Sequence, residues 1–268
     1  MDVRNGKRTA IMMLILSVLA LFASLKGVFD PTLYHEVYLA GTIPEDLIWG
    51  SQAQDIISIL FAVILAVFTL LFLKNESMKK YIIMLGLTWY FFYAFGLYTI
   101  QGQYTSIYLV YLAIFGLSFY SLAYGILGIN PAEAYRYEIP SGLRTAIGTF
   151  LYVMIAFLYP VWIMGMIPDI ASHVPGQTYA VFILDLCLIF PAVGIIAYLL
   201  LRKKPLGVIL AGVAILKIFT LCLSWTFGEL TNPLAGNTFT PEMAILSSTL
   251  TICGLILFVL YILKLKKI

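Results

Sequence analysis

The chain contains few charged residues and an unusually large share of apolar ones. Charged residues make up 11% of its 268 residues and hydrophobic residues 62%, and the mean hydropathy is +0.99. Soluble domains are about 25% charged and about 45–50% apolar. This composition excludes a soluble globular domain, a disordered chain and a nucleic-acid-binding protein, and it predicts a polytopic membrane protein.

The motifs of common enzyme and cofactor sites are also missing. The sequence has no HExxH, no G-x-S-x-G and no phosphate-binding glycine loop. It has two histidines, His35 and His173, which are far apart in the chain. A metal site that combines them with Glu36 or Asp169 is a minor alternative. The sequence therefore predicts no cofactor and no catalytic residue.

Cysteine is scarce and gives no sign of a disulfide framework. Cys187, Cys222 and Cys253 are odd in number, lie inside apolar runs and form no CxxC pattern. We therefore interpret them as small buried hydrophobic residues.

Long apolar segments dominate the rest of the chain. Each is close to the roughly 20 residues that a helix needs to cross the hydrocarbon core of a bilayer. In lipid the backbone must satisfy its own hydrogen bonds, which favours helices over isolated strands. We interpret the first segment as a retained helix, because its run is longer than that of a usual signal peptide. The predicted spans are 10–29, 55–73, 81–100, 106–128, 145–167, 178–201, 206–227 and 243–263.

The basic residues predict the orientation of these spans. With eight spans, 14 of the 16 Lys and Arg residues fall at one side of the membrane, and the exceptions are Lys26 and Lys217. The connections at the other side, 30–54, 101–105, 168–177 and 228–242, contain no Lys or Arg. Because basic loops stay in the cytoplasm, the sequence predicts an all-α, multi-pass protein of the cell membrane with both termini cytoplasmic.

The chain is predicted to form one transmembrane domain, 1–268, with a hypothetical duplication into halves 1–128 and 145–268. Asp55 precedes Lys74 by nineteen residues, and Asp185 precedes Lys204 by the same number. Both halves would begin at the same side, so the repeats would be parallel. The narrow composition of membrane helices also allows such a match by chance.

Two ionisable residues lie within predicted spans, where a charge costs about 2.5–3.5 kcal/mol near the bilayer centre. They are Asp185 in the sixth span and Lys217 in the seventh. Consecutive helices joined by a short turn are usually neighbours, so these two side chains can form a pair. The pair is expected either to belong to a solute or ion pathway or to fix the packing of the two helices. Pro191 follows in the sixth span and predicts a kink there.

Asp55 begins the second predicted span and is expected at the mouth of a cavity, with Lys26 as a candidate partner. A carboxylate at this position is also explained by helix capping and the helix dipole. The alternative for Lys26 is a lysine that extends to the membrane surface.

Tyrosines on the third and fourth spans are candidates for the wall of such a cavity. Tyr104, Tyr108 and Tyr111 are spaced as one face of a helix, and Tyr90 and Tyr93 as another. Because a short turn joins the two spans, these faces can oppose each other. The alternative is an interfacial aromatic belt together with ordinary packing.

Several stretches together resemble a family of prokaryotic integral membrane proteins with no known activity. They are GSQAQDIISIL (50–60), YLVYLAIFGLSFYSL (108–122), LDLCLIFPA (184–192) and RKKPLGVILA (202–211). Relatives in that family often carry His shortly before the aspartate of the sixth span, where this chain has Phe182. The resemblance implies the multi-pass fold and no substrate, and the departure at Phe182 argues against a proton relay at that point.

The function that we favour is a transporter or binding protein for a small solute or ion, with an outward-facing polar cavity. Asp185 and Lys217 would form its floor, Asp55 its mouth, and Tyr90, Tyr93, Tyr108 and Tyr111 its wall. A second class is a membrane sensor, assembly factor or complex subunit that binds a membrane-protein partner. A lipid-modifying enzyme is the weakest class, because no nucleophile and base are spaced for catalysis.

Overall fold

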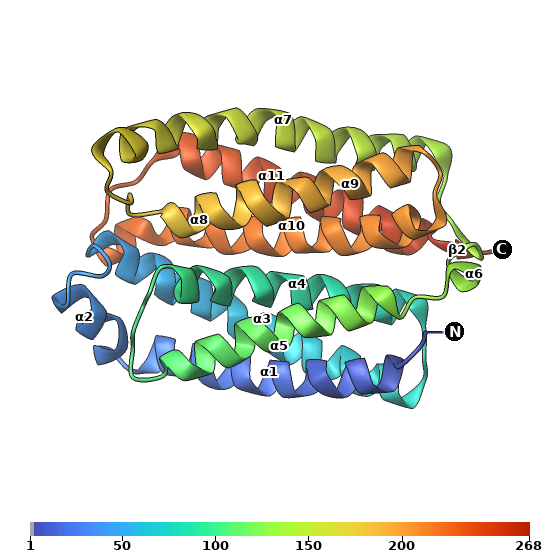
Figure 1. The fold of residues 1–268 in the computed structure, drawn as a ribbon, viewed down its shortest axis with the longest axis horizontal. Helices are drawn as coiled ribbons and strands as arrows, with labels where there is room; N and C mark the ends of the chain where they lie inside the picture. The colour runs from blue at the N-terminus through green and yellow to red at the C-terminus, as the bar shows by residue number, and fades with distance from the viewer. Residues whose placement is uncertain (1–2) are drawn as a thin grey trace.

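The structure, a computed structural model, describes residues 3–268 apart from the side chain of Asp46. Within these residues, eight helical segments are long and apolar enough to cross a membrane. They run side by side along the long axis of the molecule (Figure 1). The predicted all-α polytopic fold is confirmed.

Seven of the eight spans are continuous or nearly continuous helices, and the sixth is interrupted. The spans are α1 (Gly6–Phe29), α3 (Asp46–Lys74), α4 (Met78–Ile100), α5 (Tyr108–Leu127), α7 (Ser141–Ser172), the sixth span formed by α8 (Tyr179–Leu184), η1 (Asp185–Ile189) and α9 (Phe190–Leu201), then α10 (Pro205–Thr231) and α11 (Pro241–Lys264). The short elements are α2 (Thr32–Leu39), α6 (Pro131–Ala134), β1 (Tyr137–Glu138), η2 (Asn232–Ala235) and β2 (Lys266–Lys267).

The predicted boundaries differ from the helix ends at several spans, and most at the second and the fifth. The second span begins at Asp46 and not at residue 55, so Asp55 lies inside α3. The fifth span continues past residue 167 to Ser172, with Pro160 and Pro168 within the helix. Hydropathy marks only the part of a helix that lies in lipid, whereas the backbone continues its hydrogen bonds into the polar region.

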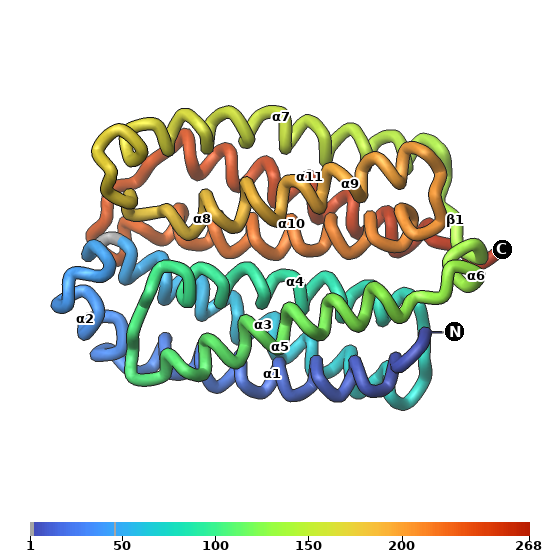
Figure 2. Tube along the Cα trace, viewed as in Figure 1, coloured from blue at the N-terminus to red at the C-terminus, as the bar shows by residue number. Residues whose placement is uncertain are grey.

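The helices form two bundles of four that pack side by side (Figure 2). In the first bundle α1 packs on α3, α3 on α4, α4 on α5, and α5 on α1. In the second bundle α7 packs on α9, α9 on α10, α10 on α11, and α11 more loosely on α7. The main contact between the bundles joins α4 and α10, where a Cβ added to Gly86 would lie 2.8 Å from the side chain of Leu216. This central position explains why α4 and α10 are the most buried of the spans.

Each bundle is closed by a short β-type pairing at the same end of the molecule. Val3 pairs with Ile129, and the Arg4 N–H donates to the Gly128 carbonyl at 2.8 Å. In the second bundle β1 pairs antiparallel with β2. We call these two pairings the clasps. They recur at equivalent places in the two halves, as does the order of neighbouring helices, and the parallel duplication itself stays a prediction.

The start of α1, the end of α5, the short helix α6 and β2 lie at one end of the molecule, which we call the basic end (Figure 1). The short helix α2 lies at the opposite end. The cytoplasmic location of the basic end stays a prediction from the distribution of Lys and Arg.

Candidate functional site

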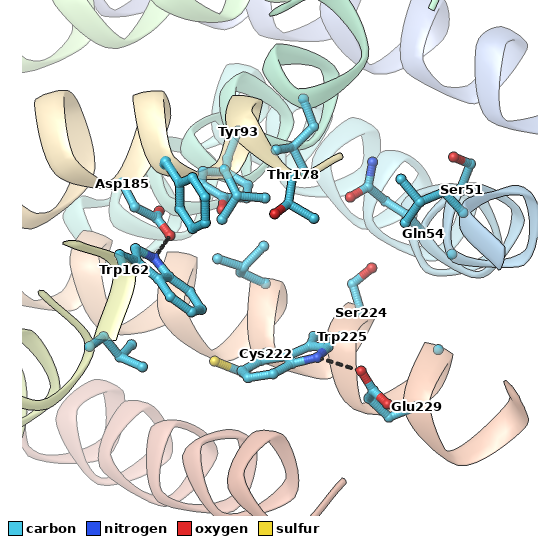
Figure 3. Close-up of a pocket in the computed structure, with 18 of the residues that line it drawn as sticks. Ser51, Gln54, Tyr93, Trp162, Thr178, Asp185, Cys222, Ser224, Trp225 and Glu229 are labelled. Carbon is cyan, nitrogen blue, oxygen red and sulfur yellow. Dashed lines mark hydrogen bonds between the residues drawn. The ribbon is translucent and has the colours of Figure 1, made fainter. Parts of the chain in front are cut away.

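A cavity of about 940 Å³ opens at the α2 end of the molecule. Its walls come from the start of α3, from α4 and α7, from the interrupted sixth span and from α10. Apolar side chains make up most of the lining, and polar side chains are grouped among them (Figure 3). The labelled polar and aromatic lining residues are Ser51, Gln54, Tyr93, Trp162, Thr178, Asp185, Cys222, Ser224, Trp225 and Glu229.

Lys217 reaches this cavity from the middle of α10 and is 1% exposed. Its Nζ atom lies 4.3 Å from the centroid of the Tyr93 ring, a favourable position for a cation over an aromatic face. Among the described residues, no carboxylate oxygen lies within 4.0 Å of this Nζ atom. The amine of Lys217 therefore has no carboxylate in direct contact, although Asp185 lines the same cavity, and it is open to a partner in the cavity.

Asp185 lines the same cavity and is 5% exposed. The indole Nε1 of Trp162 donates a 2.7 Å hydrogen bond to its Oδ2 atom (Figure 3). The Tyr93 hydroxyl also faces this carboxylate. Tyr93 therefore contacts both charged groups, with its ring under Lys217 and its hydroxyl towards Asp185.

The sixth span changes from α-helix to π-helix at Asp185, where it lines the cavity. Residues 185–189 form a π-turn, in which the Phe190 N–H donates to the Asp185 carbonyl. Pro191 follows immediately, and a proline both lacks an N–H and clashes with the carbonyl four residues before it. A π-turn widens the helix at this point and is frequent at functional sites. This change of helix type lies directly before Pro191, where the sequence predicts a kink.

Trp225 and Glu229 form a second pair of indole and carboxylate, nearer the mouth of the cavity. Trp225 Nε1 donates to Glu229 Oε1 at 2.9 Å, and Asn232 Nδ2 donates to Glu229 Oε2 at 3.4 Å. Trp162, Trp225 and Glu229 were not among the site residues predicted from the sequence. The spacing of four between Trp225 and Glu229 places both on one helix face, so this pair could have been found, whereas Trp162 lies on a different helix from Asp185.

Asp55 does not line the mouth of the cavity as expected. It is 1% exposed and lies inside the first bundle, where the hydroxyl of Tyr34 on α2 donates to its Oδ2 atom. The Tyr98 hydroxyl lies 3.3 Å from its Oδ1 atom. The expected position was wrong because α3 starts nine residues before Asp55, which removes this residue from the helix end.

Lys26 is not a partner of Asp55. Its Nζ atom forms an ion pair with Asp30 at 2.7 Å, four residues further along the chain. This hydrogen bond, together with those from Thr32, lowers the pKa of Asp30 to about 2. The lysine side chain is 43% exposed, which agrees with the alternative of a residue at the membrane surface.

Of the four candidate wall tyrosines, the structure places only Tyr93 among the residues that line the cavity. Tyr90 shares a 2.8 Å hydrogen bond with Ser58 in the bundle interior. Tyr111 is buried in the first bundle, and the Tyr108 hydroxyl donates to the carbonyl of Thr99. Tyr108 and Tyr111 do not line the cavity because α5 packs on α1 and α4 in the first bundle and contributes no residue to the cavity lining.

The two histidines lie in different halves of the molecule. His35 is on α2 beside Tyr38, and His173 follows the end of α7. Among the described residues, no group of three or more His, Cys, Asp or Glu side chains is arranged to hold a metal ion.

Comparison with known proteins adds no relative. No protein-family model, curated protein or solved structure matches the chain. The resemblance to a prokaryotic membrane family stays a prediction.

Proposed function

We propose that the protein binds a small solute with a charged group in the cavity at the α2 end, and carries that solute across the cell membrane. The observation that carries the proposal is the buried amine of Lys217, which lines the cavity with no carboxylate oxygen within 4.0 Å among the described residues. A charge buried in a membrane helix usually faces protein or water and marks a pathway for a solute, ion or proton. By the distribution of basic residues, the cavity opens to the outside.

The lining indicates the chemistry of the solute. Lys217 can bind a carboxylate or phosphate group, and Asp185 can accept hydrogen bonds from an amine or hydroxyl group. The apolar walls and the indole rings of Trp162 and Trp225 can bury the remainder of the molecule. Sites for small molecules commonly measure about 300–1,000 Å³, so the cavity is large enough for an amphipathic zwitterion or organic anion.

The test is a ligand screen on the purified protein followed by variants of the floor. Anionic and zwitterionic solutes are screened by thermal shift, and those that bind are used for uptake into proteoliposomes. Since a hydrogen bond to a charged group contributes about 1.5–3 kcal/mol, Lys217→Met should weaken binding by about 10- to 100-fold. Lys26→Met is the matched control, because Lys26 lies outside the cavity lining.

Binding that is unchanged in Lys217→Met and in Asp185→Asn would refute a solute site at the floor. Normal binding without uptake would indicate a receptor and not a carrier. Stable co-purification with another membrane protein, without any solute binding, would favour a complex subunit.

The side on which the cavity opens is tested by thiol labelling. In a variant with Cys187, Cys222 and Cys253 replaced by Ser, Ser224→Cys places a thiol in the cavity lining. A membrane-impermeant reagent added outside should label it. Ser118→Cys is the control, because Ser118 is buried outside that lining and should stay unlabelled.

A further inference from the structure

A second carboxylate, Asp55, is buried in the first bundle away from the cavity lining. It is surrounded by hydroxyl groups: those of Tyr34 and Tyr98 lie within hydrogen-bonding distance, and Ser24 lies beside it. The backbone of α1 also approaches closely, because a Cβ added to Gly27 would overlap the carboxylate. Asp55 is thus enclosed by α1, α2, α3 and α4.

No basic group compensates this carboxylate among the described residues. From α2, α4 and α5, the titratable groups facing it are the phenols of Tyr34, Tyr90, Tyr98 and Tyr111. From α1, Ser24 and Gly27 face it, while Lys26 is paired with Asp30. The charged residues of α10, Lys217 and Glu229, line the cavity.

An ionised carboxylate in such a place is expensive, because burial removes water and no cation replaces it. A bound proton removes the charge and needs no additional space. The surrounding hydroxyls can still bond to the neutral acid, since each can both donate and accept. The geometry therefore favours a protonated Asp55.

Tyr98 connects this carboxyl group to the cavity. Its hydroxyl lies 3.3 Å from Asp55 Oδ1 and 3.0 Å from the Ser51 carbonyl. Tyr98 and Ser51 both line the cavity. The hydroxyl of Tyr111 is buried in the same region, and its ring packs on that of Tyr98, so the polar cluster extends beyond Asp55 itself.

We propose that Asp55 is a proton-binding site that exchanges its proton with the cavity through Tyr98. A hydronium ion in the cavity gives a proton to the Tyr98 oxygen, and the phenolic O–H gives its own proton to Asp55 Oδ1. Water, neutral Tyr98 and neutral Asp55 result, so charge and protons balance. The reverse steps release the proton. This site does not depend on the solute proposed above.

Infrared spectroscopy of the full-length protein in liposomes tests the site directly. At neutral pH the wild-type protein should show the C=O stretch of a protonated carboxyl group, which shifts on exchange into D₂O. Asp55→Asn should lack this band, whereas the control Glu76→Gln, at an exposed position, should retain it. Tyr34→Phe should shift the band because it removes a hydrogen bond to the carboxyl group.

Tyr98→Phe tests the route. The carboxyl band should persist, but its deuterium exchange should slow by at least tenfold. An unchanged exchange rate would overturn the role of Tyr98. A wild-type spectrum in which no carboxyl band responds to Asp55→Asn or to Tyr34→Phe would overturn the proton site itself.

Stability provides a second readout. A proton held in the folded protein is released on unfolding at any pH above about 4, the ordinary titration range of aspartate. As the pH rises above that value, the folding equilibrium constant of the wild-type protein should fall by up to tenfold per pH unit. The constant of Asp55→Asn should lack this contribution to the pH dependence. Asp55→Asn should fold, because asparagine resembles the neutral acid. Parallel pH profiles, or a dependence of wild-type stability on Na⁺ in place of pH, would contradict the proposal.

Discussion

The two charged groups of the cavity floor should behave as an energetic unit, and a double-mutant cycle can measure this. The variants are Lys217→Met, Asp185→Asn and the double substitution. Because no carboxylate lies within 4.0 Å of Lys217 Nζ among the described residues, the attraction between the two charges is below about 4 kcal/mol at an effective dielectric constant of 20. Tyr93 touches both groups and transmits any movement between them.

The single substitutions should differ in their cost. Asp185→Asn removes the negative charge nearest to the Lys217 amine in the cavity and should lower the free energy of unfolding by no more than about 4 kcal/mol, the bound given above. Lys217→Met leaves Asp185 with its hydrogen bond from Trp162 and should cost less. The double variant should be more stable than the sum of the single effects predicts, by about 1–3 kcal/mol.

Reversible unfolding in mixed detergent micelles is the assay. The control cycle combines Lys217→Met with Glu229→Gln, since these residues lie twelve positions apart on α10, about 18 Å along the helix axis. The control should be additive within about 0.5 kcal/mol. If the stability losses of Lys217→Met and Asp185→Asn were equally additive, the two side chains would not interact energetically.

Three further substitutions test separate contacts. Trp162→Phe removes the indole donor to Asp185 and should destabilise the protein by about 1.5–3 kcal/mol, measured by the same unfolding assay. Gly27→Ala places a methyl group against the Asp55 carboxylate and should cost about 1–3 kcal/mol, seen as a lower midpoint temperature. Glu133→Gln weakens the ion pairs with residues 136 and 267 at the second clasp, so amide hydrogen exchange at residues 266–268 should become faster. The loss of stability should be about 1 kcal/mol or less, because both basic partners are half exposed.

Matched controls identify the cause of each effect. Trp225→Phe removes the same indole donor from the less buried Glu229 and should cost less than Trp162→Phe. Gly50→Ala should be nearly neutral, because nothing lies within 4 Å of the added Cβ. If each control cost as much as its test variant, the specific contacts would not explain the losses.

The sequence was sufficient for the architecture because the physical requirement is simple. Spans need length and apolar side chains, and all eight were found on that basis. Lys217 and Asp185 were expected together because consecutive antiparallel helices are neighbours, and the structure places both in one cavity.

The positions of Asp55 and of most tyrosines could not be predicted in the same way. α3 contacts both bundles, and Gln54 and Asp55, adjacent in sequence, are about 100° apart around the helix. Gln54 lines the cavity, while Asp55 faces the interior of the first bundle. A sequence pattern shows that a helix has two polar faces, but it does not show which neighbour each face meets.

Because each half is closed by its own clasp, the peptide bond that joins the two halves should not be needed for folding. Each bundle joins its own first and last segments, and the halves meet through α4 and α10. Two separately translated polypeptides, 1–129 and 130–268, should therefore co-assemble in the membrane and co-elute as one complex. The protein would then be a heterodimer encoded as a single chain.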